Sequence, residues 1–257
     1  TVKRDYVNKN SGLSVRCVTY NISGCTDSLA CNYDEDANTN DGSCEYNSDT
    51  WYVSTDGDNA NCGSELYPFA SIQYAIDSAS DGDTVFVSAG TYQSPNLEIT
   101  KNIFIYGEDK ELTILDGQDS RVAYFHLNSY ATFENFTIQN SSGFEAGALK
   151  INGSSPHLKN LIIRDNNVED SGAGIYIMRD GDGNLAEPLI ENCIFKNNYA
   201  GDKGGAVYLT VNASPTFKNC LFDSNSANDR GGAISSGTTQ PIIENCTFFN
   251  NYSNSEI

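Results

Sequence analysis

A short acidic stretch near the start of the chain carries the residue types best suited to binding a metal ion. Oxygen-bearing side chains recur there at nearly every second position and are followed by Gly42: Asp34, Asp36, Asn38, Asn40 and Asp41. Calcium takes about six to eight oxygen ligands at about 2.4 Å, so a loop that binds it turns such side chains toward one centre. The spacing therefore predicts calcium as a cofactor at these five residues. The alternative is a solvated turn.

The eight cysteines fall into an early and a late group. An early group in a short acidic segment indicates disulfides and an oxidising compartment. That group is Cys17, Cys25, Cys31, Cys44 and Cys62. The late group, Cys193, Cys220 and Cys246, occupies one position of a repeat. Because free Cys behaves as a small apolar residue, we expect these three to stack in the interior and not to bind metal.

Acid–base chemistry would need a Lys or Arg beside carboxylates, and three loop positions offer these types. They are Asp165, Asp202-Lys203 and Asp229-Arg230. Solvated charge is also expected at such loops, and no carboxylates cluster at one strand position of adjacent repeats. His126 and His157 look isolated, so a structural role is expected for both. The sequence therefore favours a segment without catalytic residues.

These residues are positioned by a repeat that fills the second half of the chain. Each copy reads apolar, charged, Asn, apolar, variable, apolar, and the Asn recurs at intervals of 25, 32, 27 and 26 residues. The copies are Phe133–Ile138, Leu158–Ile163, Ile190–Phe195, Phe217–Phe222 and Ile243–Phe248. The long interval predicts a protruding loop at 179–186.

The Asn of each copy breaks the alternation that a strand requires. Ile190 and Cys193 are three residues apart, whereas Cys193 and Phe195 are two apart, so the extra residue is a bend. Asn is the non-Gly residue that best tolerates a left-handed backbone. Each repeat is thus a strand, an Asn corner, a strand, a loop and a Gly-rich third strand. Repeats of this kind bury their apolar faces by stacking at about 4.8 Å per coil.

The first part of the repeat region has a different pattern. Apolar residues have helical spacing between Phe69 and Ser80, and Asp81-Gly82 ends that pattern. Strands are then predicted at Thr84–Val87, Gly90–Tyr92, Ile103–Ile105 and Thr113–Leu115. A helix ahead of the first coils is how a solenoid seals its end. No cap precedes Ile257, so we expect the natural chain to continue.

Two sets of residues resemble known β-helical families. Pro68–Gln73, Asp81–Asp83 and Gly90–Tyr92 resemble the opening of pectin-lyase-like proteins. The Gly-Gly-Ala segments that end at Val207 and Ile234 resemble repeats of polymorphic outer-membrane adhesins. The resemblance implies an all-β fold, a right-handed parallel β-helix (solenoid) with an N-terminal capping helix, preceded by a small disulfide-bonded module. Lyases, hydrolases, adhesins and stalks share this scaffold.

The early cysteines belong to a further resemblance. Gly24–Asp27, Ala30–Tyr33 and Asp41–Tyr46 resemble a Cys/Asp module of large secreted bacterial proteins, notably those of Bacteroidota. We expect Cys25 and Cys44, which bracket it, to be bonded, because closing a loop of about 20 residues contributes about 3 kcal/mol. Many members have a further cysteine where this chain has Asn40, which leaves Cys17 and Cys62 as candidate partners of Cys31.

The expected organisation has three parts. Residues 1–20 are a C-terminal stub of a preceding domain, because Ser11–Cys17 resembles the last strand of the Fibrobacter-type major paralogous domain. Residues 21–48 are the Cys/Asp-rich, calcium-binding module. Residues 49–257 are the β-helix, truncated at its C-terminal end.

Charge and composition limit the partners. Carboxylates outnumber Lys plus Arg by 34 to 15, and the net charge of −19 repels nucleic acid. No apolar stretch reaches the roughly 18 residues of a membrane span. We expect a fragment of a large secreted or cell-surface bacterial protein, acting as a structural stalk, adhesin or glycan-binding repeat. Its partners would be extracellular glycans or a host or neighbouring cell surface, with secretion machinery engaged through domains outside this chain. The alternative is a polysaccharide lyase or glycoside hydrolase of the pectin-lyase-like fold.

The residue before each corner Asn alternates in charge. The series is Glu134, Lys159, Glu191, Lys218 and Glu244. If the coils stack in register, these side chains point outward about 4.8 Å apart, and opposite charges then face one another. Because this face neutralises itself, we predict a structural ladder there and no active site.

Overall fold

The computed structural model describes residues 20–118, 120–143, 147–179 and 185–255. The chain divides into two compact units, Thr1–Tyr46 and Asn47–Ile257. The stub expected over residues 1–20 lies outside the described residues except for Tyr20, and so does most of the loop predicted at 179–186. Within the described ranges, no helix has the length and apolar character needed to cross a membrane.

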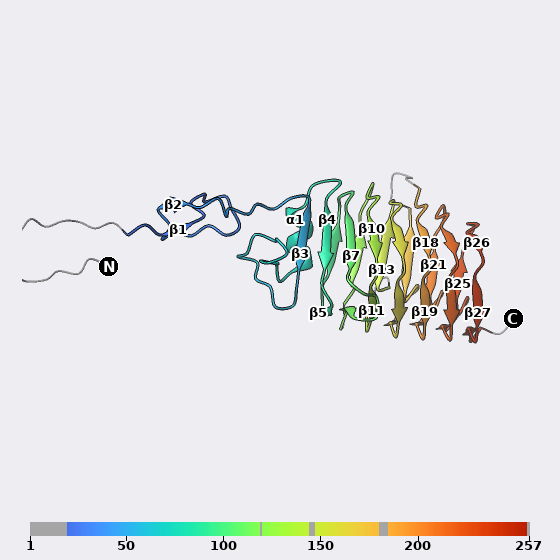
Figure 1. Ribbon diagram of the computed structural model, residues 1–257. Coiled ribbons are helices and arrows are strands. Elements are labelled where there is room, and N and C mark those ends of the chain that lie inside the picture. Colours follow the sequence, from blue (N-terminus) through green and yellow to red (C-terminus); the bar gives the residue numbers. More distant parts are fainter. Residues whose placement is uncertain (1–19, 119, 144–146, 180–184, 256–257) are drawn as a thin grey trace, which may run out of the picture. The chain divides into compact units, whose positions relative to one another are not determined.

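The second unit is a right-handed parallel β-helix, as expected from the repeat and from the resemblance to β-helical families (Figure 1). Each of the coils that begin with β10, β14, β18 and β22 contributes one strand to each sheet, and strands of successive coils pair in parallel. The sequence predicted three strands per repeat, whereas four sheets form, because a two-residue pairing lies between the second strand and the Gly-rich one. We number the sheets I to IV by size. In the repeat region the chain visits them in the order I, II, IV, III.

The strands of each sheet follow in chain order. Sheet I has eight strands: β3 (Thr50–Val53), β4 (Thr84–Val87), β7 (Phe104–Gly107), β10 (Thr132–Glu134), β14 (His157–Lys159), β18 (Leu189–Glu191), β22 (Thr216–Lys218) and β26 (Ile242–Glu244). Sheet II has seven: β5 (Gly90–Gln93), β8 (Thr113–Asp116), β11 (Thr137–Gln139), β15 (Ile162–Arg164), β19 (Ile194–Lys196), β23 (Leu221–Asp223) and β27 (Thr247–Phe249). Sheet III has six: β6 (Leu97–Ile99), β9 (Ala123–Phe125), β13 (Leu149–Asn152), β17 (Ile175–Met178), β21 (Val207–Leu209) and β25 (Ile234–Ser236). Sheet IV has five: β12 (Ser142–Gly143), β16 (Asn167–Val168), β20 (Tyr199–Ala200), β24 (Ser226–Ala227) and β28 (Tyr252–Ser253).

A short helix, α1 (Ile72–Ser78), covers the first coils, as expected. The side chain of Ser71 accepts a hydrogen bond from the backbone N–H of Tyr74 and so caps the helix start. At the other end, Lys101 Nζ donates to the carbonyls of three residues, Ile76, Asp77 and Ala79, at 2.9, 2.7 and 2.6 Å. A cation at a helix C-terminus satisfies carbonyls that have no intrahelical partner. The helix is shorter than predicted because Ala79 already has an extended backbone.

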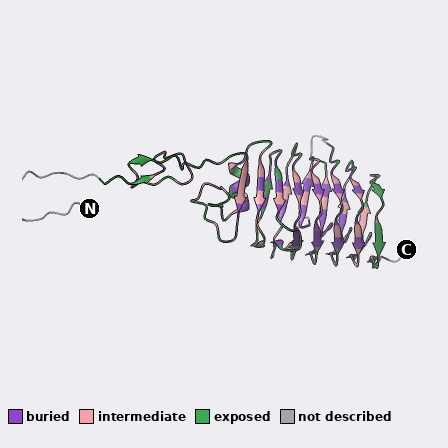
Figure 2. Cartoon of the chain, in the orientation of Figure 1, coloured by how far each residue is buried: buried purple, intermediate pink, exposed green. Residues whose placement is uncertain are grey.

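The Asn corners are confirmed. Asn135, Asn160, Asn192, Asn219 and Asn245 all have positive φ, between 51° and 66°. Each corner turns the chain from sheet I into sheet II, so the apolar residues on both sides face one interior. Buried residues line that interior along the coils (Figure 2).

The late cysteines stack in the interior, as expected. Cys193 and Cys220 are buried and Cys246 is partly buried, and all three are free thiols. Burial raises the pKa of Cys193 well above its usual value. Beside them Phe222 stacks between Phe195 and Phe248, with ring centroids 4.6 and 4.7 Å apart.

A second row of asparagines was not predicted as a structural element. The side-chain amide of Asn166 donates to Asn198 at 2.8 Å, Asn198 donates to Asn225 at 2.8 Å, and Asn225 donates to Asn251 at 2.9 Å. Asn166, Asn198 and Asn225 are fully buried. Because buried polar groups are costly unless they are paired, this row fixes the register of four coils.

The charge ladder on sheet I is confirmed. Glu134 pairs in register with Lys159, Lys159 with Glu191, Glu191 with Lys218, and Lys218 with Glu244. Lys159 Nζ lies 2.9 Å from Glu134, and Lys218 Nζ lies 3.4 Å from Glu191. Burial opposes the ionisation of Glu191, but Lys218 and His157 outweigh it and lower the pKa of this carboxyl. The stabilisation is therefore present at neutral pH and is lost as the pH falls through that lowered value.

The asparagine row gives a first prediction. Asn198→Ala leaves the buried side-chain amide and backbone N–H of Asn166 without their acceptor, and the carbonyl of Ile163 without its donor. We therefore expect the free energy of unfolding to fall by about 3 kcal/mol. Asn251→Ala removes the same side chain at the partly exposed end of the row and should cost about a third as much. Denaturant unfolding measures both. Equal losses of unfolding free energy in the two variants would show that burial of the asparagine row does not increase its contribution to stability.

The charge ladder gives a second prediction. Lys159→Glu combined with Lys218→Glu places like charges side by side, and we expect it to destabilise the protein by about 1 to 2 kcal/mol at low salt. High salt should reduce the loss, because these side chains are partly exposed. Thermal unfolding at two ionic strengths measures it. The control reverses all five ladder charges, which keeps the alternation and should restore the melting temperature. A control as unstable as the double variant would contradict the ladder.

Candidate functional site

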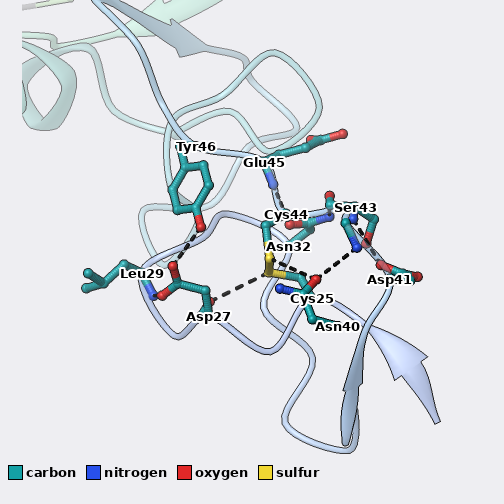
Figure 3. The surroundings of a disulfide bond; sticks show 11 residues. Cys25, Asp27, Leu29, Asn32, Asn40, Asp41, Ser43, Cys44, Glu45 and Tyr46 are labelled. Atoms are coloured by element: carbon teal, nitrogen blue, oxygen red, sulfur yellow. Dashed lines mark hydrogen bonds between the residues drawn. A yellow bond between two sulfur atoms is a disulfide. The ribbon is translucent and has the colours of Figure 1, made fainter. Parts of the chain in front are cut away.

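The disulfide between Cys25 and Cys44 is present and lies in the first unit (Figure 3). It joins segments beside a two-stranded parallel sheet of β1 (Ser23–Gly24) and β2 (Thr39–Asn40). Cys31 and Cys62 are also disulfide-bonded, while Cys17 lies outside the described residues. Next to the Cys25–Cys44 disulfide, the hydroxyl of Tyr46 donates to Asp27 at 2.6 Å, which lowers the pKa of Asp27. The hydrogen bonds of Figure 3 hold the chain ends of this module together.

Four of the five predicted calcium ligands are engaged in hydrogen bonds with the backbone of this unit. Four side-chain oxygens accept backbone N–H groups: Asp34 from Asp36 at 3.0 Å, Asn38 from Ile22 at 3.1 Å, Asn40 from Gly42 at 2.9 Å, and Asp41 from Ser43 at 3.0 Å. Hydrogen bonds from Ser43 lower the pKa of Asp41. Oxygen donors of this kind suit calcium, but among the described residues no three His, Cys, Asp or Glu side chains gather as metal ligands. Calcium at this loop stays a prediction, and binding would have to draw Asp34, Asp36 and Asp41 together.

The charged loops beside sheet IV form ion pairs. Lys203 Nζ lies 2.9 Å from Asp202 and 3.8 Å from Asp229, and Arg230 Nε lies 3.0 Å from Asp229. The backbone places Asp170, Asp202 and Asp229 one above another on consecutive coils. This stack was not predicted, because the three residues lie in loops and not at a strand position. Lys203 bridges the carboxylates of Asp202 and Asp229, so its positive charge partly neutralises the negative charge of the stack.

The expectation that both histidines are isolated is wrong. His157 Nε2 lies 3.4 Å from Glu191 Oε2, although the geometry is not that of a hydrogen bond. His126 Nε2 contacts Glu98 Oε2, and its ring centroid lies 3.9 Å from that of Tyr124. His126 therefore belongs to a group of side chains on the outer face of sheet III.

We call this group the Tyr124 cluster. Its members are Glu98, Arg121, Tyr124, His126, Lys150 and Asn152. Strand register brings them together, since Glu98 pairs with Tyr124, and Tyr124 with Lys150, on three consecutive coils. The inward neighbours of Tyr124, Ala123 and Phe125, are fully buried. They fix the strand that presents the tyrosine to solvent.

Two cations share the ring of Tyr124. The Arg121 guanidinium lies 4.9 Å and Lys150 Nζ lies 5.2 Å from the ring centroid. Such cation–π contacts hold long cationic side chains in place at a partly exposed site. Asn152 Nδ2 donates to the Tyr124 hydroxyl at 3.0 Å, which fixes the ring.

The carboxylate of the cluster is engaged. Glu98 Oε1 lies 3.8 Å from Arg121 and Glu98 Oε2 contacts His126. The backbone N–H of Glu98 donates to the side chain of Gln73 in α1 at 2.8 Å, which ties the cluster to the capping helix. The cluster contains two cationic side chains, Arg121 and Lys150, and one carboxylate, so its net charge is positive. The protein as a whole has a net charge of −19.

Aromatic side chains continue the row on the next coils. Lys150 pairs in register with Tyr176, and Tyr176 pairs with Tyr208. The rings of Tyr176 and Tyr208 lie 5.3 Å apart. This face therefore offers charge for an anion and flat rings for a sugar, because pyranose C–H groups pack on aromatic faces. A signal for the row was available in the sequence, since its four positions are 26, 26 and 32 residues apart, close to the intervals of the corner Asn.

The chain matches a family model and one curated relative. The family is described as the Pel9A-like, right-handed beta helix region, and it matches residues 51–256. A pectate lyase, PEL9 of Emericella nidulans, is 35% identical over 75 residues. The match covers 26% of this chain and 18% of that relative.

Solved structures with the same type of fold are more distant in sequence. A rhamnogalacturonan lyase is 18% identical with a TM-score of 0.48, and the match covers 77% of this chain and 56% of that one. A GH136 lacto-N-biosidase from Eubacterium ramulus is 14% identical with a TM-score of 0.45 over 79% and 56%. A carrot pectin methylesterase is 14% identical with a TM-score of 0.40 over 79% and 83%. The first two matches cover little more than half of those proteins.

The first unit generates the third prediction. We expect calcium to slow proteolysis of residues 25–46 and a chelator to accelerate it, because ligation would order a segment with little core. Mass spectrometry of a limited digest measures the rates. Asp36→Asn should abolish the calcium effect, whereas Glu35→Gln, an exposed carboxylate outside the predicted set, should retain it. Cleavage at the same rate with calcium and with chelator would refute the site.

Proposed function

Because the chain belongs to the Pel9A-like right-handed β-helix family, we propose that it is an extracellular segment that binds an acidic polysaccharide on the outer face of sheet III. The segment would hold the polymer without cleaving it, as part of a larger secreted or cell-surface bacterial protein. The observation that carries this proposal is the pair of cations, Arg121 and Lys150, on the ring of Tyr124.

Charge and shape favour a uronic-acid polymer. Each sugar of such a chain carries a carboxylate, and charge-assisted hydrogen bonds from Arg and Lys bind carboxylates strongly. The neighbouring rings of Tyr176 and Tyr208 give a surface against which further sugars could stack. The curated relative is a pectate lyase, and pectate is a polymer of an acidic sugar. The attraction is local, because the protein as a whole carries a net charge of −19.

The partners of the cluster suit binding better than proton transfer. Glu98 is shared between Arg121 and His126, and Lys150 is held against the ring of Tyr124. Side chains held in this way are preorganised for a bound anion, which lowers the entropy cost of binding. A rigid solenoid with such a face suits a stalk or adhesin that contacts extracellular glycans.

An extracellular location is supported by the disulfides. Cys25 and Cys44 form one, and Cys31 and Cys62 are also bonded. Disulfides persist in oxidising compartments and are rare in the cytosol. Secretion would engage domains outside this chain.

A second candidate function is β-elimination of the same polymer. It is favoured by the pectate lyase relative and by the closeness of two basic side chains, Arg121 and Lys150, to one ring. A base would remove the proton from the carbon next to the uronate carboxylate, and the glycosidic oxygen would leave with the bonding electrons. The product would be an unsaturated sugar.

The fourth prediction tests the binding proposal. We expect oligogalacturonate to bind the protein, and Lys150→Gln or Arg121→Gln to weaken binding about fivefold each, more at low salt than at high salt. Isothermal titration calorimetry measures the affinities. The control is Lys196→Gln, which removes the same charge from the outer face of sheet II and should leave binding unchanged.

Three outcomes separate the alternatives. Equal affinity for a neutral glucan would refute recognition of the carboxylate. Binding that is unchanged in both cluster variants would place the site elsewhere. An unsaturated product, detected by its ultraviolet absorbance and lost in Lys150→Gln, would establish the lyase candidate in place of simple binding.

A further inference from the structure

A second outward-facing surface lies at the start of sheet I. Tyr52, Phe86 and Tyr106 pair in register on β3, β4 and β7, at the strand position that becomes the charge ladder from Glu134 onward. The rings of Tyr52 and Phe86 lie 5.6 Å apart at 53°. Phe104 stacks beside Tyr106 with centroids 6.3 Å apart and is 42% exposed. The first coils thus carry an aromatic row where later coils carry alternating charges.

A pocket of about 330 Å³ opens beside this row. Tyr52 and Phe86 line it together with Glu65 and Pro68 of the loop after β3, and with Glu108 after β7. Ser54 and Ser88 complete the lining. The pocket therefore combines aromatic faces with carboxylates and hydroxyls.

The loop wall of the pocket is fixed to β3. The backbone N–H of Tyr52 donates to Gly63 at 2.8 Å, and the carbonyl of Tyr52 accepts from Phe69 at 2.9 Å. Within the loop, Gly57 lies so close to the chain that an added Cβ would stand 2.3 Å from the carbonyl oxygen of Phe69. On the opposite side Glu108 Oε2 accepts from the N–H of Ala89 at 2.8 Å. The pocket is preorganised, because both walls are held by backbone hydrogen bonds.

The charge of the pocket is negative. Of the described residues that line it, two are carboxylates, Glu65 and Glu108, and none is a Lys or Arg. Burial raises the pKa of Tyr92 to about 12, and the charges of Glu108 and Asp56 add to that effect. An aromatic face is itself the negative part of the ring quadrupole. Anionic sugars are therefore disfavoured here, whereas a cation gains from both the rings and the carboxylates.

We propose that this pocket binds a glycan that carries free amino groups, with an ammonium group held between the aromatic rings and the carboxylates. A single ammonium ion would occupy only one ring and one carboxylate. The row of Tyr52, Phe86 and Tyr106 spans three coils and is therefore long enough for a ligand of several units. Rings in a row at the coil spacing give pyranose units a surface on which to stack, which favours an amino sugar over a lysine side chain. The site is separate from the Tyr124 cluster, which lies on sheet III and selects the opposite charge.

The fifth prediction uses three trisaccharides with the same linkage that differ at one substituent. A glucosamine trimer should bind at pH 6 about tenfold more tightly than the N-acetylglucosamine trimer or the glucose trimer, because only the first is cationic. Glu108→Gln and Glu65→Gln should each weaken its binding about fivefold, and Tyr52→Leu should weaken it at an unchanged melting temperature. Calorimetry or NMR titration measures the affinities.

The matched control is Glu111→Gln, which removes one exposed carboxylate that follows Glu108 closely in the sequence but lies outside the pocket's lining. It should leave binding unchanged, and so should Lys150→Gln in the Tyr124 cluster. An equal loss of affinity in Glu111→Gln and Glu108→Gln would mean that the glucosamine trimer is attracted by the net charge of the protein and not by this pocket. That result would overturn the proposal. Equal binding of the acetylated trimer, effective competition by a lysine peptide, or no binding of the glucosamine trimer would overturn it as well. None of these results bears on uronate binding at sheet III.

Discussion

The structure depends on parallel, in-register pairing between successive coils. Residues one repeat apart are brought to about 4.8 Å, so any side chain has a counterpart directly above and below it. The backbone pairing leaves register to be fixed by side chains, and the buried asparagines do this because each amide both donates to and accepts from a neighbouring coil. A slip of one residue would break that chain and turn the apolar faces outward. Corners, core and surface rows all follow from this constraint.

The same geometry gives the outer faces different properties. On the later coils of sheet I, Glu and Lys alternate, so the face neutralises itself and stabilises the stack. On its first coils the row is aromatic and bordered by Glu65 and Glu108. On sheet III, Arg121 and Lys150 both contact the ring of Tyr124, and Glu98 is the one carboxylate of that cluster. One solenoid can thus carry a charge ladder, a negative pocket and the positive Tyr124 cluster. This is possible because each coil contributes one residue to each row, so the chemistry of a row can change from coil to coil.

Parts of this arrangement were predictable because the period is visible in the chain. The corner Asn at five positions, the stack of Cys193 and Cys220, and the alternating charges before each corner all follow once the repeats are aligned. The helix was predictable from its apolar spacing, although its end at Ser78 was not, since that depends on Lys101 from a later coil. The two-residue strands of sheet IV were missed because pairs so short have no period of their own.

The sequence by itself determined the coil, because the distance between repeated apolar residues fixes which side chains face the interior and where the chain turns. It also determined the self-neutralising ladder, since adjacency follows from the repeat alone. Only the tertiary structure decided the two candidate sites. The row of Tyr124 and Lys150 follows the repeat interval, but Arg121 and His126 lie outside the strands and reach Tyr124 and Glu98 only in the folded chain. Glu65 lines the same pocket as Phe86 because a long loop folds back along β3. Contacts of this kind depend on how irregular segments pack, and no local pattern in the chain encodes that packing.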